Sequence, residues 1–124
     1  DSAWAGLWYD PTKDGEGYNL IISPIGRILY FYGFKNSGLR LWLVSALMAA
    51  PFEIGQAVTV DLFESTTGTF DAPQPSDEAL VQWGTAEITV IDCNTVTILL
   101  RGSDGNKASD NVRLAGIIGA DCTL

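Results

Sequence analysis

The region from Trp8 to Ser45 constrains the fold most, because it contains three extended, aromatic-rich runs joined by two turns with glycine. Side chains of an extended chain alternate between two sides, and in the middle run both sides are apolar. One side carries Ile28, Tyr30, Tyr32 and Phe34, and the other carries Leu29 and Phe31. The region therefore predicts a three-stranded antiparallel meander covered on both faces, by the rest of the domain, by another chain or by a ligand.

Eight segments have the composition of β-strands, and turns rich in Gly, Pro, Asn and Asp separate most of them. The predicted strands are 6–9, 17–23, 27–34, 40–47, 57–63, 86–92, 95–101 and 111–118. Consecutive antiparallel strands hide their edges by closing into a barrel or by folding into two packed sheets. We therefore predict a single all-β domain over residues 1–124, either an antiparallel up-and-down β-barrel or a two-sheet sandwich of about eight strands.

The connection 64–82 is too long for a tight turn, and it contains two prolines and four acidic residues. Connections of this length in compact domains are usually functional or mobile. Ser76 has the residue type of a helix N-cap, and two acidic residues follow it, where they would favour a helix N-terminus. We expect one short helix near 76–82 that covers an end of the barrel.

The balance of charge excludes two classes of partner. The chain has 15 acidic and 7 basic residues and a formal net charge of −8, which repels phosphate backbones and anionic headgroups. It also lacks an uninterrupted apolar run of the ~20 residues that span a bilayer. We therefore expect no nucleic-acid partner and no membrane insertion.

The two cysteines, Cys93 and Cys122, do not form a CxxC metal or redox pair. A disulfide between them would close a loop of about 30 residues and stabilise the fold by about 3–4 kcal/mol. The alternative is two buried thiols in a cytosolic protein. The sequence shows no visible signal peptide and starts with Asp1 instead of Met, which would suit a mature form or a trimmed chain. We expect a secreted or periplasmic protein, with attachment to the cell surface left open.

The chain contains no histidine, the commonest general base and metal ligand. We therefore predict a protein that is not an enzyme and has no metal site and no cofactor. A carboxylate pair is the remaining catalytic alternative, and its candidates are Asp10, Asp14, Glu16, Asp77 and Glu78. They lie in turn-like segments, where solvated charge is the ordinary outcome, and their spacing lacks the calcium-loop pattern.

Aromatic side chains are the candidate binding residues, because exposed Trp and Tyr on a sheet form a stacking platform for sugar rings or flat ligands. Most aromatics of a small β domain fill its core, and we expect this of Phe31 and Trp42. Three tyrosines are less suited to a core, because each buried hydroxyl needs a hydrogen-bond partner. We expect these tyrosines to share one face of the meander, and we add two tryptophans as candidate ligand-binding residues. The set is Tyr18, Tyr30, Tyr32, Trp8 and Trp83.

Three segments resemble a recurrent domain of secreted Gram-negative bacterial proteins: GLWYDPTKDGEGYNLI, GRILYFYGFKNSGLRLWLVS and VRLAGIIGADC. That domain carries WW/WY-N/D-P, SG-x-G-F, an aromatic strand, D-x-x-G-x-P-x-W-L and a tail of the RL-x-x-x-x-G-x-x-C kind. The matching positions are Trp8, Tyr9, Asp10, Pro11, Gly15, Gly17, Tyr18, Gly38, Trp42, Leu43, Arg113, Leu114 and Cys122. The chain departs from the pattern at Asp14, where Ser is usual, and at Leu41, where Pro is frequent. The resemblance implies an exported β domain and no particular activity.

The opening G-x-W-Y of the first predicted strand is also similar to that of avidin-type barrels, which hold a small flat ligand with Trp and Tyr. This is a likeness of architecture, and architecture alone does not carry function.

These observations predict a non-enzymatic exported binding module whose aromatic face recognises carbohydrate or another small neutral ligand. One alternative is a structural or oligomeric domain whose aromatic face packs on a second copy to form a homodimer. Another is a carboxylate-dependent hydrolase. A cavity lined by Tyr and Trp would favour the first, a flat buried patch the second, and two facing buried carboxylates the third.

The disulfide can be tested directly. If Cys93 and Cys122 are bonded, thiol titration of the unfolded, unreduced protein should detect no thiol, and reduction should release both. Two free thiols before reduction would contradict the pairing and weaken the argument for an oxidising compartment.

Overall fold

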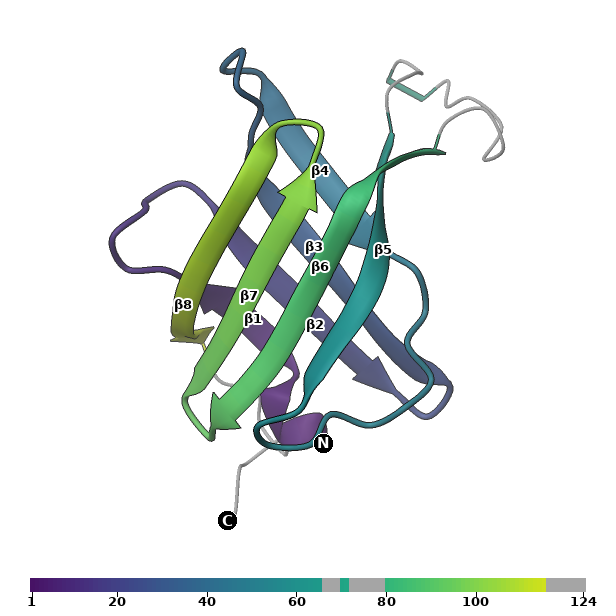
Figure 1. The fold of residues 1–124 in the computed structure, drawn as a ribbon, viewed down its shortest axis with the longest axis vertical. Coiled ribbons are helices and arrows are strands. Elements are labelled where there is room, and N and C mark those ends of the chain that lie inside the picture. Colours follow the sequence, from purple (N-terminus) through teal and green to yellow (C-terminus); the bar gives the residue numbers. More distant parts are fainter. Residues whose placement is uncertain (66–69, 72–79, 116–124) are drawn as a thin grey trace.

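The structure, a computed structural model, describes residues 1–65, 70–71 and 80–115. Eight antiparallel strands form one closed barrel, in which each strand pairs with the next and the last pairs with the first. They are β1 (Gly6–Tyr9), β2 (Gly17–Ser23), β3 (Gly26–Phe34), β4 (Arg40–Ser45), β5 (Ala57–Ser65), β6 (Leu80–Asp92), β7 (Thr95–Gly102) and β8 (Gly105–Ala115). The predicted antiparallel up-and-down barrel is confirmed (Figure 1).

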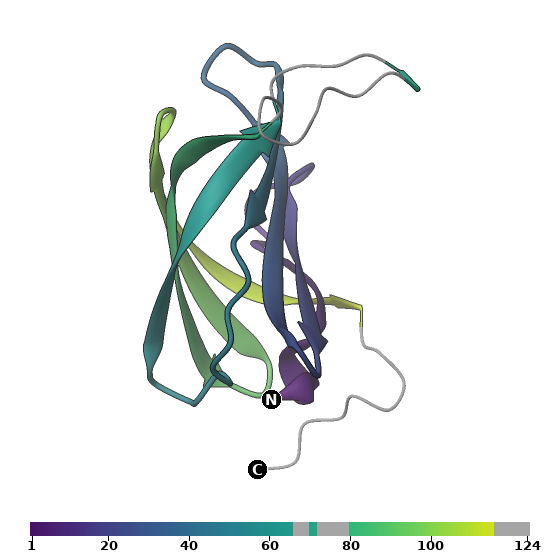
Figure 2. The same cartoon turned by 90° about the vertical axis from the view of Figure 1, so that its right-hand side faces the viewer.

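The barrel is flattened into two walls that face each other across the core. Figure 1 shows β5–β8 in front of β1–β4, with the strands of the two walls crossing. In the side view of Figure 2 the walls stand apart, and β8 reaches across to the wall of β1. We call β1–β4 the first wall and β5–β8 the second wall. Because β8 pairs with both β7 and β1, it closes the barrel.

Alternation within the strands builds the core. In β3, for example, Leu29 and Phe31 point inward and are buried, whereas Tyr30 and Tyr32 point outward. Strands β5, β6 and β7 use mainly Val, Ile and Leu at their inward positions, and the β-branched types among these pack well on a pleated surface. The buried apolar side chains are Trp4, Trp8, Tyr18, Leu20, Leu29, Phe31, Leu41, Leu43, Met48, Phe52, Val60, Leu62, Trp83, Ala86, Ile88, Val90, Val96, Ile98 and Leu100.

A short 3₁₀ helix, η1 (Ser2–Trp4), closes the lower end of the barrel in Figure 1. Two side chains attach it there. The indole nitrogen of Trp4 donates to the Asp92 carbonyl at 2.9 Å, and Arg27 donates two hydrogen bonds to the Asp1 carboxylate at 2.7 Å each. The pattern analysis did not predict this helix, because three residues are too few to show helical periodicity.

Arg113 of β8 binds the N-terminal segment to the rest of the barrel at this lower end. Its guanidinium lies 4.5 Å from the centre of the Trp8 ring system and donates two hydrogen bonds to the Cys93 carbonyl, at 3.0 and 3.2 Å. It also donates to the carbonyl of Ala3. One side chain of β8 therefore ties together β1, the segment that leads into it and the turn between β6 and β7.

Two strands have bounds that differ from those expected by more than two residues. β6 starts at Leu80 rather than at residue 86, and β8 runs from Gly105 to Ala115 rather than over 111–118. The short helix expected near 76–82 is wrong at 80–82, which belong to β6, and its positions 76–79 lie outside the described residues. Cys122 also lies outside them, so the disulfide stays a prediction. Within the described part of the chain, no helix has the length and hydropathy to cross a membrane.

Substitution of Arg113 tests its role in closing the barrel. Arg113→Gln removes the charge from the bonds to two carbonyls and the contact with Trp8, so we expect a loss of about 2–3 kcal/mol of stability. The melting temperature should fall by roughly 5–10 °C. Arg101→Gln on the exposed face of β7 is the matched control and should change it little. Equal effects of the two substitutions would contradict the role given to Arg113.

Candidate functional site

The register between β2 and β3 divides the predicted tyrosines between two faces. Ser23 pairs with Gly26 at the turn, which places Tyr18 opposite Phe31 and Asn19 opposite Tyr30. Residues that pair directly share a face, so Tyr18 points into the barrel with Phe31. The expectation that Tyr18 lies on the same face as Tyr30 and Tyr32 is therefore wrong, by a single position of register.

Tyr18 is a core residue, with 3% of its surface exposed. Its ring centre lies 5.1 Å from that of Phe31, and its hydroxyl is 3.4 Å from the Ser109 hydroxyl. Burial raises the pKa of the Tyr18 hydroxyl well above its usual range. Trp8 is also internal, being 1% exposed, and its indole nitrogen donates to the Trp4 carbonyl at 2.9 Å.

Tyr30 and Tyr32 do stand together on the outside of the barrel, and Trp42 joins them. The rings of Tyr30 and Tyr32 are nearly parallel, with centres 6.3 Å apart. Trp42 pairs with Tyr32 across β3 and β4 and meets its ring edge-on, at 5.5 Å. Trp42 is 64% exposed, so the expectation that it fills the core is wrong. We call Tyr30, Tyr32 and Trp42 the aromatic platform.

Two hollows on the outer surface adjoin the platform, and Tyr32 lines both. The larger, of about 390 Å³, lies beside β1 and the loop that follows it. The smaller, of about 190 Å³, includes all three platform residues together with Phe63 and Leu80. The platform therefore lines the smaller hollow, and Tyr32 connects it to the larger one.

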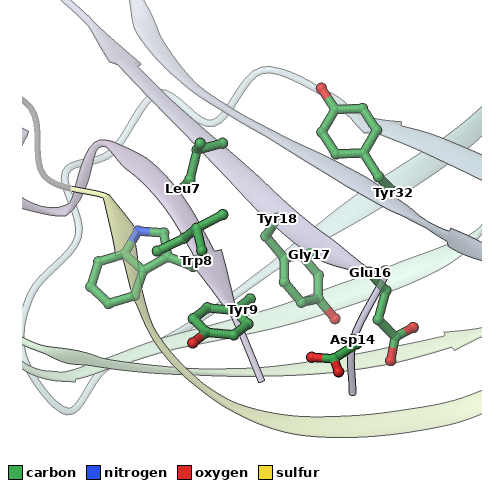
Figure 3. A pocket seen from close by; sticks show the side chains of 10 residues that line it. Leu7, Trp8, Tyr9, Asp14, Glu16, Gly17, Tyr18 and Tyr32 are labelled. Atoms are coloured by element: carbon green, nitrogen blue, oxygen red, sulfur yellow. The ribbon is translucent and has the colours of Figure 1, made fainter. Parts of the chain in front are cut away.

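The larger hollow is mainly apolar, with two carboxylates at one end. Figure 3 shows Asp14 and Glu16 close together there, with Leu7 and Tyr32 farther along. The Glu16 carboxylate accepts a hydrogen bond from Lys107 Nζ at 2.6 Å. Trp8 and Tyr18 also line this hollow, although both side chains are buried.

The second wall has a different outer surface. Its central outward positions carry mainly threonine and charged side chains, as on an ordinary solvated sheet. They include Thr59, Asp61, Thr85, Glu87, Thr89, Thr97, Arg101 and Asp110. The centre of the second wall is therefore polar outside, whereas exposed apolar side chains of this wall, such as Val81, Ile91 and Leu114, lie near the ends of its strands.

Trp83, the remaining predicted binding residue, lies at the opposite end of the barrel from η1. The indole nitrogen of Trp83 donates to one oxygen of the Asp104 carboxylate at 2.9 Å. The backbone amide of Asn36 donates to the other oxygen at 3.0 Å. These two donors lower the pKa of Asp104. Trp83 also lines a cavity of about 310 Å³ inside this end. Trp83 is therefore separate from the platform, and the five residues predicted to bind a ligand do not form one site.

The carboxylates considered for catalysis do not face one another as a buried pair. Asp10 accepts hydrogen bonds from the hydroxyl and the amide of Thr12, which lower its pKa, and Glu16 is paired with Lys107. Asp14 is exposed. Asp77 and Glu78 lie outside the described residues. In the part of the chain that the structure describes, no three His, Cys, Asp or Glu side chains gather as metal ligands.

Comparisons with protein-family models, with curated proteins and with solved structures found no match for this chain. The resemblance drawn from the sequence motifs therefore stays a prediction.

The bonds to Asp104 predict a pH dependence. Its pKa is lower in the folded protein than in the unfolded chain, so the unfolded state takes up a proton first as the pH falls. The stabilisation is complete above the unfolded pKa of about 3.9 and is lost as the pH falls through the folded value. Wild type should melt above Asp104→Asn near pH 6, and the difference should shrink near pH 3. A difference that stays constant with pH would contradict this role.

Proposed function

We propose that this domain is a non-enzymatic binding module of an exported protein and that it holds a neutral carbohydrate on the aromatic platform. The observation that carries the proposal is the 64% exposure of Trp42, which lines the smaller hollow in direct contact with Tyr32, and Tyr32 in turn borders the larger hollow. A large ring left in water at the centre of a sheet face gains apolar contact only when something covers it.

Sugar rings suit such a platform because their C–H faces stack on aromatic rings while their hydroxyls stay in water. The hollows on either side of Tyr32 favour a ligand that extends along the wall over a single small molecule. Polar groups lie within reach of this path: the hydroxyls of Tyr30 and Tyr32, the Asn19 amide opposite Tyr30, and the Asp14 carboxylate. The net charge of −8 opposes polyanionic glycans, so the proposed ligand is neutral.

A second candidate function is association with another copy of the chain. It is favoured by aliphatic side chains near the platform, because Leu7, Ile21 and Leu114 are 39%, 41% and 59% exposed. Sugars gain little from aliphatic surface, whereas an isologous interface between two first walls would bury it. The homodimer would use the same surface as the glycan. Glycan binding and the mass of the protein in solution must therefore both be measured to separate the two candidates.

Trp42→Ala tests the leading candidate on an array of neutral glycans. Removal of the central ring should weaken binding by roughly tenfold or more, since buried aromatic anchors dominate such surfaces. Thr97→Ala on the second wall is the matched control, an outward-facing sheet position outside the platform, and should bind as wild type does. The melting temperatures of both variants should stay near that of wild type.

Sedimentation velocity separates the two candidates. If the wild-type protein is a monomer that binds glycan and Trp42→Ala is a monomer that does not, the carbohydrate proposal holds. If the wild-type protein is a dimer that Trp42→Ala converts to monomers, and neither binds a neutral glycan, the homodimer is correct and the carbohydrate proposal is wrong.

A further inference from the structure

The end of the barrel opposite η1 holds a cavity that the proposed function does not use. It has a volume of about 310 Å³ and lies among the loop after β1, the turn between β3 and β4, and the turn between β7 and β8. We call it the mouth. Phe31, Leu41 and Leu100, all buried, form its apolar lining from within the barrel. Cavities of this size in the mouths of β-barrels are common binding sites.

Two glycines let aromatic rings lie flat against the wall of the barrel at the mouth. A Cβ at Gly33 would run into the ring of Phe31, and a Cβ at Gly102 would run into the ring of Trp83. Each ring therefore occupies the place where a neighbouring side chain would stand. Both rings line the cavity.

Hydrogen bonds fix the polar rim of the mouth. The Asp104 carboxylate accepts hydrogen bonds from the Trp83 indole and from the backbone amide of Asn36. The side-chain amide of Asn36 donates to the backbone carbonyl of Asp104 at 2.8 Å. On the other side, Lys107 is bonded to Glu16 at 2.6 Å. The three connections around the mouth are thus tied to the strands, and an ordered rim reduces the entropy lost on binding.

The charges on the rim sum to zero. Lys13 and Lys107 contribute two positive charges, and Glu16 and Asp104 contribute two negative charges. Their balance gives no net attraction to an ion of either sign, whereas their oxygen and nitrogen atoms, with those of Asn106, can bond to the edge of a polar ring. The aromatic lining favours a flat molecule, because ring faces stack on Trp and Phe.

We propose that the mouth binds a small, flat, uncharged molecule that stacks beside Trp83 and Phe31 and bonds through its edge to the polar rim. The site lies inside the barrel, whereas the platform lies on the outer face of the first wall. The mouth is therefore a site separate from the platform, although Glu16 lines both the mouth and the larger hollow beside the platform.

The test follows the indole N–H signal of Trp83 by NMR, assigned from its loss in Trp83→Phe. Adenine is the uncharged probe, and benzoate and benzamidine are flat probes of opposite charge. Adenine should shift the Trp83 signal saturably and bind at least tenfold more tightly than either ion. Asn106→Trp places a bulky ring on the exposed rim and should weaken adenine binding at least tenfold.

Trp42→Ala is the control, because it alters the platform and leaves the mouth intact. It should bind adenine as wild type does, so failure of the glycan proposal would not affect this result. The mouth proposal is overturned if adenine does not shift the Trp83 signal saturably, or if Asn106→Trp binds adenine as wild type does. Tighter binding of benzoate or benzamidine would overturn the assignment of an uncharged ligand.

Discussion

Closure of eight strands around one core determines what each side chain can do. Each strand has two faces, and the barrel buries only the inner one, so the outward side chains of β1–β4 have no covering layer in the described structure. At the centre of the second wall these positions are polar, as solvation requires, and exposed apolar side chains lie only near the ends of its strands. In the first wall they are Tyr, Trp and aliphatic residues. That asymmetry is the physical basis for placing a binding surface on one wall and not on the other.

The same alternation separates two aromatic environments that are adjacent in sequence. Tyr30 and Tyr32 face outward onto the platform, whereas Phe31 between them faces inward and lines the mouth. The structure therefore has shallow hollows on the outer face of the first wall and a separate cavity that opens at one end of the barrel.

The sequence predicted the barrel well where alternation is apolar, and the expected bounds of β1 and β2 equal the observed ones. It missed the first six residues of β8, because the inward side chains Lys107, Ser109 and Asn111 are polar and the strand lacks the pattern of a buried face. It misassigned Tyr18 because one step of register, fixed by the turn, decides the face. The outward position of Trp42 could have been predicted, because Trp42 lies between Leu41 and Leu43 and alternation places it on the face opposite to theirs. The mouth could not have been predicted from the sequence, because the residues that line it come from segments far apart in the chain.

The most direct test of the central claim, an open aromatic platform that binds neutral glycan, is hydroxyl-radical footprinting with and without a neutral oligosaccharide. Without it, Tyr32 and Trp42 should be modified much faster than the buried Trp8 and Tyr18. With it, protection should appear at Tyr32 and Trp42 and leave Trp83 unchanged. Slow modification of Trp42 in the isolated protein, or no protection by any neutral glycan that is retained on the array, would contradict the account.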